Sequence, residues 1–295
     1  MTARIAVTGA SGFCGGVVAR AAAAAGADVV CLGRRPGPVG EFRYWDASRR
    51  TPPDLTGTDV VLHLAAAVGD PPPGRVAEAA FRAVNVDGAA RLLAAAGTRT
   101  VVWVSSASVY APAGPEPIRE DHPLAGMTAY GRTKAAGERL ALAAGAVVLR
   151  PRAVYGHGDQ HLLPRLRRAV RGGRALLPGP DVPLSLTAVE NLADACLAAV
   201  DWLPGAYNIA DAEPYRRDRV VEAVCGARVR HLPIPVATAA ATMATALARV
   251  TRRPPVLTRY AVEQLTNAVI LDIGRARAQG WNPRRCLADY LREVR

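Results

Sequence analysis

The sequence predicts an α/β fold, with a doubly wound parallel sheet followed by a smaller and mostly helical C-terminal region. Up to about residue 150, short apolar runs rich in β-branched side chains alternate with alanine-rich stretches of helical length. This alternation is typical of parallel strands that are joined by helices. The expected strands are apolar throughout, as in sheets that are covered on both faces. Beyond residue 150 the alternation weakens, and prolines, arginines and helical patterns become frequent.

Each element follows from its local pattern. In the first half we expect strands at residues 5–7, 28–32, 59–64, 100–104 and 147–149. Helical periodicity predicts helices at residues 13–25, 76–96 and 128–144. A loop rich in proline and glycine is expected at residues 70–74. In the second half we expect helices at residues 163–171, 190–200, 216–223 and 256–267, and one more strand at residues 206–210.

Composition excludes several classes of protein. A chain of 295 residues, half of them hydrophobic and 21% charged, can bury a large core, which argues against a disordered or fibrous protein. The net charge is +12, but the arginines are scattered and aromatic residues make up only 5%, so we expect no nucleic-acid partner. Five widely spaced cysteines without a CxxC pair favour a reducing compartment.

Neither export nor membrane attachment is expected. The first strand begins near Arg4, which leaves no room for a signal peptide. The longest apolar stretch without a charge, residues 232–248, holds two prolines and is shorter than the roughly 20 residues of a membrane-spanning helix. We therefore predict a soluble, cytoplasmic protein.

A glycine-rich turn follows the first expected strand and opens the first helix. Gly9 permits a sharp turn, Gly12 lets the backbone approach a pyrophosphate, and Gly15 lets the helix pack closely on the strand. The helix N-terminus adds free N–H groups and a partial positive charge. The position between a strand and a helix distinguishes such a motif from a plain turn. We therefore expect a Rossmann-type dinucleotide site that includes Gly9, Ser11, Gly12, Phe13 and Gly15.

The end of the second expected strand selects between the two nicotinamide dinucleotides. NAD sites usually carry an acidic residue here, which binds the ribose 2′-hydroxyl. This strand ends in Gly33-Arg34-Arg35, and Asp28 stands at its other end. Two guanidinium groups can pair with a 2′-phosphate. We expect Arg34 and Arg35 to bind NADP(H), although arginines at this place would also suit a solvated loop.

Tyr130 and Lys134 stand four residues apart and share one face of the expected helix. A free tyrosine has a pKa of about 10, and a neighbouring ammonium group lowers this pKa because it stabilises the phenolate. Tyr130 could then exchange a proton with a substrate oxygen while hydride moves at the adjacent carbon. Lys134 is the only lysine among 37 basic residues, which singles it out.

Serines follow the strand expected at residues 100–104, at the carboxyl end where parallel sheets bind ligands. Any one of Ser105, Ser106 and Ser108 could form a hydrogen bond with the substrate oxygen. The same serines would also suit an ordinary turn at the end of a strand.

These motifs, taken in order, resemble the extended short-chain dehydrogenase/reductase family, which is the superfamily of NAD-dependent epimerases and dehydratases. The resemblance covers most of the chain and rests on the glycine turn, on the segments 63–66, 85–88 and 149–156, and on Tyr130 with Lys134. It implies that Ser106, Tyr130 and Lys134 are the catalytic residues. It also implies cofactor contacts by Tyr130 and Lys134 and by Asp46, Ala47, Leu64, Ala65, Ala66, Asn85, Pro151 and Val154.

The second half resembles the 3β-hydroxysteroid dehydrogenase-like branch of this family, which implies a fairly apolar substrate. Many relatives act on nucleotide sugars and often carry an asparagine where this chain has Ala153. They also often carry charged residues for the diphosphate where this chain has residues 184–186, Leu-Ser-Leu. A dehydratase would need an acidic pair directly after Ser106, where this chain has Ala-Ser. Residues 232–250 could form an apolar lid or a buried helix.

The sequence thus predicts an NADP(H)-dependent oxidoreductase that interconverts a secondary alcohol and a ketone on a small, largely apolar molecule. Residues 1–152 would form the NADP-binding domain, with residues 184–210 interleaved into it, and residues 153–295 the substrate-binding region. We expect no metal, because residues 157–161 fit a family loop. The resemblance implies a homodimer through the two long helices of the first half. Alternatives are a nucleotide-sugar epimerase or dehydratase with tightly bound NAD, and a non-catalytic module that senses NADP.

Overall fold

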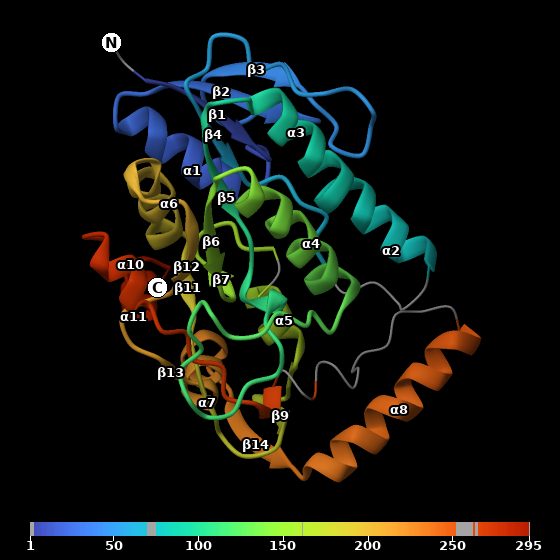
Figure 1. The fold of residues 1–295 in the computed structure, drawn as a ribbon. Coiled ribbons are helices and arrows are strands. Elements are labelled where there is room, and N and C mark those ends of the chain that lie inside the picture. Colours follow the sequence, from blue (N-terminus) through green and yellow to red (C-terminus); the bar gives the residue numbers. More distant parts are fainter. Residues whose placement is uncertain (1–2, 70–74, 161, 252–261, 263–264, 295) are drawn as a thin grey trace.

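The computed structural model describes residues 3–69, 75–160, 162–251, 262 and 265–294. Its centre is a parallel sheet of seven strands in the order β12-β6-β5-β4-β1-β2-β3 (Figure 1). These strands are β1 (Arg4–Thr8), β2 (Asp28–Gly33), β3 (Glu41–Tyr44), β4 (Val60–His63), β5 (Thr100–Val104), β6 (Val147–Pro151) and β12 (Gly205–Ile209). The strand order reverses between β1 and β4, as in doubly wound sheets of the Rossmann type. The predicted fold class is confirmed.

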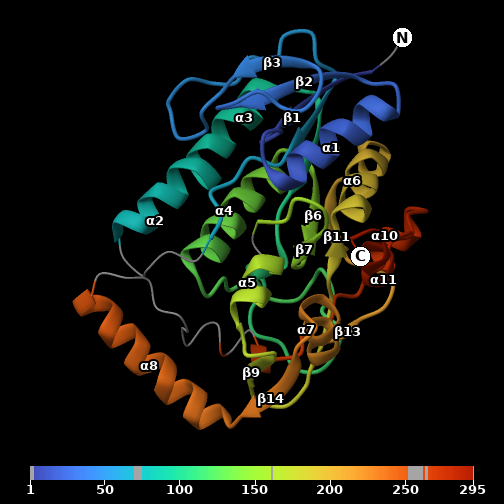
Figure 2. The ribbon, with the colours of Figure 1, turned by 180° about the vertical axis from the view of Figure 1, so that it is seen from behind.

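Helices cover both faces of this sheet (Figures 1 and 2). On one face α1 (Phe13–Ala24) packs against α6 (Val189–Ala198), and on the other α3 (Ala89–Ala96) packs against α4 (Ala129–Ala143). Along β1, Ile5 and Val7 join the core beneath α1 and α6, whereas Ala6 joins the core beneath α3. The inner strands are mostly apolar because both faces of the sheet are buried there.

The helix predicted at residues 76–96 consists of three parts. α2 (Arg75–Arg82) leads into a π-helical turn (Ala83–Gly88), and α3 follows. Turns of this kind are rare and are often found at functional sites. A Cβ at Gly88 would lie 2.5 Å from the carbonyl oxygen of Ala47, so the π-helical turn lies very close to the chain beyond β3. Periodicity alone does not reveal such a turn.

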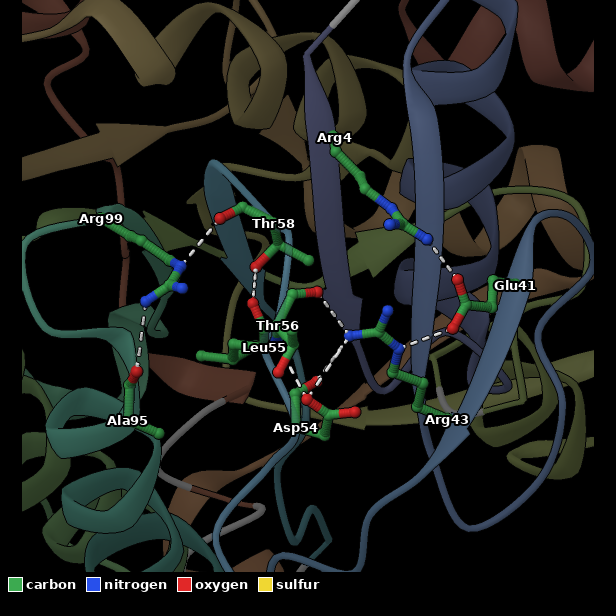
Figure 3. A network of polar contacts seen from close by, with 9 residues as sticks. All are labelled: Arg4, Glu41, Arg43, Asp54, Leu55, Thr56, Thr58, Ala95 and Arg99. Atoms are coloured by element: carbon green, nitrogen blue, oxygen red, sulfur yellow. Dashed lines mark hydrogen bonds and ion pairs between the residues drawn. The ribbon is translucent and has the colours of Figure 1, made fainter.

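The edge strand β3 is absent from the predicted strands because it is short, charged and largely exposed. A polar network holds it in place (Figure 3). Glu41 pairs with Arg4 of β1 and accepts a 2.7 Å hydrogen bond from Arg43. Arg43 also donates to the carbonyl oxygens of Thr56 at 2.8 Å and Asp54 at 3.3 Å. Contacts from two other parts of the chain, rather than apolar burial, fix this strand.

Apart from α6 and β12, the chain beyond residue 152 forms small sheets and further helices beside the main sheet (Figure 2). β7 (Val154–Tyr155) pairs with β11 (Thr187–Ala188), β10 (Pro183–Leu184) pairs with β13 (Tyr215–Arg216), and β8 (Val170–Arg171), β9 (Arg174–Pro178) and β14 (Arg228–Leu232) form a sheet of three strands. The helices are α5 (Leu162–Arg168), α7 (Arg217–Cys225), α8 (Ile234–Thr251), α10 (Gly274–Ala278) and α11 (Leu287–Glu293).

Two expectations for the second half need comment. The helix predicted at residues 163–171 ends at Arg168, because residues 170–171 pair with β9 across Gly172 and Gly173, which both have positive φ. Most of the helix predicted at residues 256–267, like the loop predicted at residues 70–74, lies outside the described residues. Within the described part of the chain, every helix is too short or too polar to span a membrane.

Candidate functional site

The glycine turn between β1 and α1 leaves the helix N-terminus bare. Gly9 has a φ of +70°, and a Cβ there would lie 2.9 Å from the backbone of Ala65. A Cβ at Gly15 would lie 2.2 Å from the carbonyl oxygen of Gly9, so both positions require glycine. Gly12 is the N-cap of α1 and has no side chain that could cap the first N–H groups. These residues fit a pyrophosphate, because free N–H groups and the helix dipole favour an anion.

A cavity of about 320 Å³ opens beside this helix N-terminus. Its walls include Ser11 and Phe13 of the glycine turn, Arg20 of α1, and His157 and Gln160 of the loop after β7. The loop therefore reaches over the glycine turn from the second half of the chain. Arginine and histidine side chains in the wall suit an anionic ligand.

The loop after β7 also has a structural role. Asp159 accepts hydrogen bonds from the backbone N–H groups of Leu162 at 3.1 Å and Leu163 at 2.7 Å. It thus caps the first turn of α5. Asp159 of this segment thus serves in capping, and His157 lies in the cavity wall.

The end of β2 meets the glycine turn. A Cβ on Gly33 would lie 3.8 Å from the hydroxyl of Ser11, and the next two residues, Arg34 and Arg35, are exposed. Hydrogen bonds from the side chain and backbone of Ser48 lower the pKa of Asp46, and the charge of Arg34 lowers it to a smaller extent. The structure therefore brings Ser11, Arg34 and Asp46 to the same end of the site.

The chain that leaves β4 is tied to β1. The backbone N–H groups of Leu64 and Ala65 each donate to Thr8 Oγ1 at 3.1 Å. The same hydroxyl lies 2.8 Å from Nδ1 of His63. Leu64, Ala65 and Ala66 are half-buried. This segment lies against the glycine turn, because the backbone of Ala65 is the nearest neighbour of Gly9 described above.

The serine turn (residues 105–108) lies against the N-terminus of α4. Ser106 is the N-cap of a short 3-10 turn, and its Oγ lies 3.1 Å from the Oγ of Ser108. Thr128 caps α4 by accepting the N–H of Gly131 at 3.0 Å. A Cβ at Gly131 would lie 2.4 Å from the carbonyl oxygen of Ser108. Tyr130, the neighbour of Gly131, therefore stands beside the turn that holds Ser106.

Lys134 lies one helical turn beyond Tyr130 and is only 2% exposed. Its Nζ donates a 2.7 Å hydrogen bond to the carbonyl oxygen of Val104, and it lies 5.2 Å from the ring centroid of Trp103. Burial lowers the pKa of Lys134 to about 8, and the charge of Glu138 opposes this shift. The only lysine of the sequence is thus enclosed between α4 and the end of β5.

Asn85 connects the segment after β4 to α4. From the π-helical turn, its Oδ1 accepts the N–H of Ala67 at 2.8 Å. Its Nδ2 donates to the carbonyl oxygen of Ala67 and to Oγ1 of Thr133, both at 3.1 Å. The buried amide of Asn85 therefore joins the helix of Tyr130 and Lys134 to the chain that passes the glycine turn.

The chain between β6 and β7 has an unusual bend. Pro151 ends β6, Val154 begins β7, and Ala153 has a φ of +45°. This conformation costs a residue with a Cβ about 1–2 kcal/mol, and such residues concentrate at functional sites. Oγ1 of Thr187 donates a 2.9 Å hydrogen bond to the carbonyl oxygen of Arg152 and helps to hold the bend. Pro151 and Val154 are therefore fixed at the carboxyl end of the sheet.

Sequence reasoning missed a buried ion pair beside these residues. Glu138 of α4 is fully buried and pairs with Arg150 of β6. Ser105 donates to the same carboxylate. One signal was present, because residues 130, 134 and 138 recur at intervals of four on one helix face. If this face buries Lys134, it also buries the glutamate at position 138. A buried carboxylate needs a charged or hydrogen-bonding partner.

The fold and the site define a dinucleotide-dependent oxidoreductase or epimerase. Residues 5–210 match the model of the NAD dependent epimerase/dehydratase family, and the chain belongs to this family. The resemblance to the extended short-chain dehydrogenase/reductase family is thereby confirmed.

Relatives with curated descriptions span most of the chain. A 2-alkyl-3-oxoalkanoate reductase of Stenotrophomonas maltophilia is 30% identical over 99% of this chain and 98% of its own length. The 4-hydroxy-2-methyl-3-oxo-4-farnesyl-3,4-dihydroquinoline-1-oxide ketoreductase of Stigmatella aurantiaca is 32% identical over 76% of this chain and 72% of its own. A UDP-glucose 4-epimerase of Streptomyces lividans is 31% identical over 97% and 93%. The relatives therefore include both reductases and an epimerase.

Solved structures support the fold. MoeE5 in complex with UDP-glucose and NAD superposes with a TM-score of 0.73, covers 98% of this chain and 96% of its own, and is 24% identical. Its similarity confirms the doubly wound architecture.

Proposed function

We propose that the protein is an NADP(H)-dependent oxidoreductase that interconverts a secondary alcohol and a ketone on a small, largely apolar substrate. The observation that carries this proposal is the placement of Tyr130 and the buried Lys134 on α4, against the turn that holds Ser106. A phenol one helical turn from a buried ammonium group is suited to proton exchange with a carbonyl oxygen. Two of the relatives are named as a reductase of oxoalkanoates and as a ketoreductase, which supports this substrate class.

Each catalytic residue has one task in this proposal. Ser106 donates a hydrogen bond that orients the substrate carbonyl. Tyr130 gives its proton to the carbonyl oxygen in reduction and takes it back in oxidation, while Lys134 stabilises the phenolate. The nicotinamide cofactor, when bound, supplies or accepts the hydride. The residues that would hold this cofactor are Gly9, Ser11, Gly12, Phe13, Gly15, Arg34, Arg35, Asp46, Ala47, Leu64, Ala65, Ala66, Asn85, Tyr130, Lys134, Pro151 and Val154.

Replacement of Tyr130 by phenylalanine tests the proton transfer. Tyr130→Phe keeps the ring and removes the proton, so we expect kcat for NADPH-dependent ketone reduction to fall by about 100-fold or more. NADPH binding should be retained. Absorbance assays with a 2-alkyl-3-oxoalkanoate would measure the loss. Tyr44→Phe, at an exposed tyrosine on β3, serves as the control and should behave as the wild type. Full activity of Tyr130→Phe would remove Tyr130 from the mechanism.

The choice of cofactor is tested at Arg34. Fluorescence titration should show tighter binding of NADPH than of NADH, because a guanidinium group pairs with the 2′-phosphate. Arg34→Ala should weaken NADPH binding about tenfold and leave NADH binding nearly unchanged. Arg82→Ala, at an arginine that is 61% exposed on α2, is the matched control. Equal binding of both dinucleotides would favour a protein that retains NAD.

A nucleotide-sugar epimerase is the second candidate, because the relative from Streptomyces lividans is named UDP-glucose 4-epimerase. The apolar side chains of Leu184 and Leu186 offer no donor to a diphosphate. Incubation with UDP-glucose distinguishes the two activities, since an epimerase would convert it without net consumption of NADPH. Tight cofactor binding without turnover of ketones or nucleotide sugars would instead indicate a sensing module.

We also propose a division of labour along the chain. Residues 1–152 would hold NADP(H), residues 153–295 the substrate, and residues 184–210 would belong partly to the first unit. The pairing of β12 with β6 supports this interleaving. We further propose a homodimer in the cytoplasm, formed through the helices of residues 76–96 and 128–144, that acts without a metal, a nucleic acid or a membrane.

A further inference from the structure

A buried carboxylate joins α4 to the end of β5. Oε2 of Glu138 accepts a 2.5 Å hydrogen bond from Oγ of Ser105, and Oε1 accepts a 3.1 Å hydrogen bond from Nε of Arg150. The side chain of Glu138 is 0% exposed and that of Arg150 is 3% exposed. An ion pair removed so completely from water needs a complete set of partners, because each charge loses its hydration.

Two different side chains of α4 bind the two residues before Ser106. Lys134 binds the carbonyl oxygen of Val104, and Glu138 binds the hydroxyl of Ser105, as described above. Ser106 follows these two residues directly, and the turn that it caps lies against α4. Two contacts from one helix thus set where Ser106 lies relative to Tyr130.

The position of the carboxylate is itself fixed by a chain of contacts. Nη1 of Arg150 donates to Oη of Tyr110 at 2.8 Å and to the carbonyl oxygen of Glu120 at 2.9 Å. Oη of Tyr110 donates to Oδ1 of Asn208 at 2.6 Å. These contacts run from α4 through β6 to β12. The carboxylate of Glu138 therefore cannot rotate without breaking several buried hydrogen bonds.

Among the charged groups that the structure describes around Lys134, Glu138 is the one that favours its protonated form. Lys134 shares its helix with Tyr130 and Glu138, and its charge also acts on His63 at the end of β4. Burial, together with the charge of Lys134, lowers the pKa of His63 to about 3, so this ring is neutral at pH 7. From β5, Lys134 contacts the carbonyl oxygen of Val104 and the ring of Trp103, which are both uncharged. Glu138 is thus the anion that opposes the effect of burial on Lys134.

We propose that Glu138 is a positioning residue of this site, which keeps Lys134 an ammonium ion and holds the serine turn against α4. The proposal rests on the proposed function for the tasks of Tyr130 and Lys134 and extends it, since Glu138 acts through Lys134 and Ser105. A neutral side chain of the same shape would keep the hydrogen bond from Ser105 and lose the charge.

The single lysine makes this proposal testable without a substrate. Protein labelled with ¹³C at the lysine ε-carbon gives one lysine resonance, whose chemical shift follows the ionisation of Lys134. We expect a midpoint near pH 8 in the wild type. In Glu138→Gln the midpoint should fall by about one pH unit, because a nearby anion is lost. The alkaline limb of the pH profile of kcat/KM for ketone reduction should move in the same direction.

Two further variants complete the test. Glu78→Gln removes an exposed carboxylate of α2 that pairs with Arg132 of α4. This variant should leave the midpoint of Lys134 unchanged. Glu138→Gln leaves Arg150 buried without its anion, which destabilises the fold. The double variant Glu138→Gln/Arg150→Met removes both charges and should show a smaller downward shift, because the lost cation partly offsets the lost anion.

The outcomes separate this proposal from the proposed function. An unchanged Lys134 midpoint in folded Glu138→Gln or in the double variant would overturn the role of Glu138. A loss of activity that is equal at every pH, with an unchanged midpoint, would reduce Glu138 to a packing residue. A shifted midpoint in a protein that reduces no ketone would support the role of Glu138 and count against the proposed function alone.

Discussion

The protonation state of His63 is fixed by its neighbours. Thr8 Oγ1 accepts two backbone N–H groups, so its own hydrogen must go to Nδ1 of His63. The remaining hydrogen of the neutral ring is then on Nε2, which contacts no acceptor among the described residues. The ring lies 4.3 Å from that of Trp103, centroid to centroid. A second proton would have to enter this buried site next to the charge of Lys134.

Acid should therefore destabilise the protein through His63. The unfolded chain binds a proton on this residue below about pH 6.5, whereas the folded chain does so only near pH 3. The contribution of His63 to stability is fully present above pH 6.5 and is lost as the pH falls toward 3, by about 2 kcal/mol at pH 5. Urea denaturation at pH 7 and pH 5 measures this loss.

A substitution isolates the effect of His63. His63→Gln should lose about 2 kcal/mol less than the wild type between pH 7 and pH 5. His157→Gln, at an exposed histidine, is the control and should keep the wild-type pH dependence. The same pH dependence in His63→Gln and the wild type would contradict the assignment.

At the scale of elements, the contact between α4 and the π-helical turn depends on Gly137. A Cβ at this position would lie 2.1 Å from the carbonyl oxygen of Asn85 and 3.1 Å from the ring of Trp103. A side chain would push α4 away from residues 83–88. Lys134 lies one turn earlier on α4, so its hydrogen bond to Val104 would be disturbed as well.

Gly137→Ala should therefore destabilise the protein by about 1–3 kcal/mol, because the added methyl overpacks the contact. This outcome is opposite to the intrinsic preference of a helix interior for alanine over glycine. Thermal denaturation would measure the change, and ketone reduction should also slow. Gly114→Ala is the control, because a Cβ at this loop position meets nothing within 4 Å. A fully stable Gly137→Ala protein would show that α4 can shift without cost.

The two halves of the chain differ in how far their elements could be predicted. The strands near β1, β2, β4, β5, β6 and β12 follow from the sequence because burial on both faces demands continuous apolar runs. β3 does not, because Arg4 and the turn at residues 54–56 hold it from distant parts of the sequence. Most strands beyond residue 152 have only two residues, and pairing rather than pattern defines them.

At the scale of the whole molecule, the site divides in a similar way. Local motifs named Ser106, Tyr130 and Lys134, and the fold brings their elements together. The pair of Glu138 and Arg150 depends on the register between α4 and β6, which no local pattern contains. The left-handed backbone of Ala153 was equally hidden, because alanine gives no hint of a positive φ.

The burial of Lys134 has a consequence for the chemistry of the surface. All other basic side chains that are charged at neutral pH are arginines, so the folded protein presents guanidinium groups and no lysine amine to solvent. Acylating reagents attack amines and spare guanidinium groups. Such a reagent can reach Lys134 only when α4 separates from the end of β5. The rate of modification of Lys134 therefore measures how often this site opens locally.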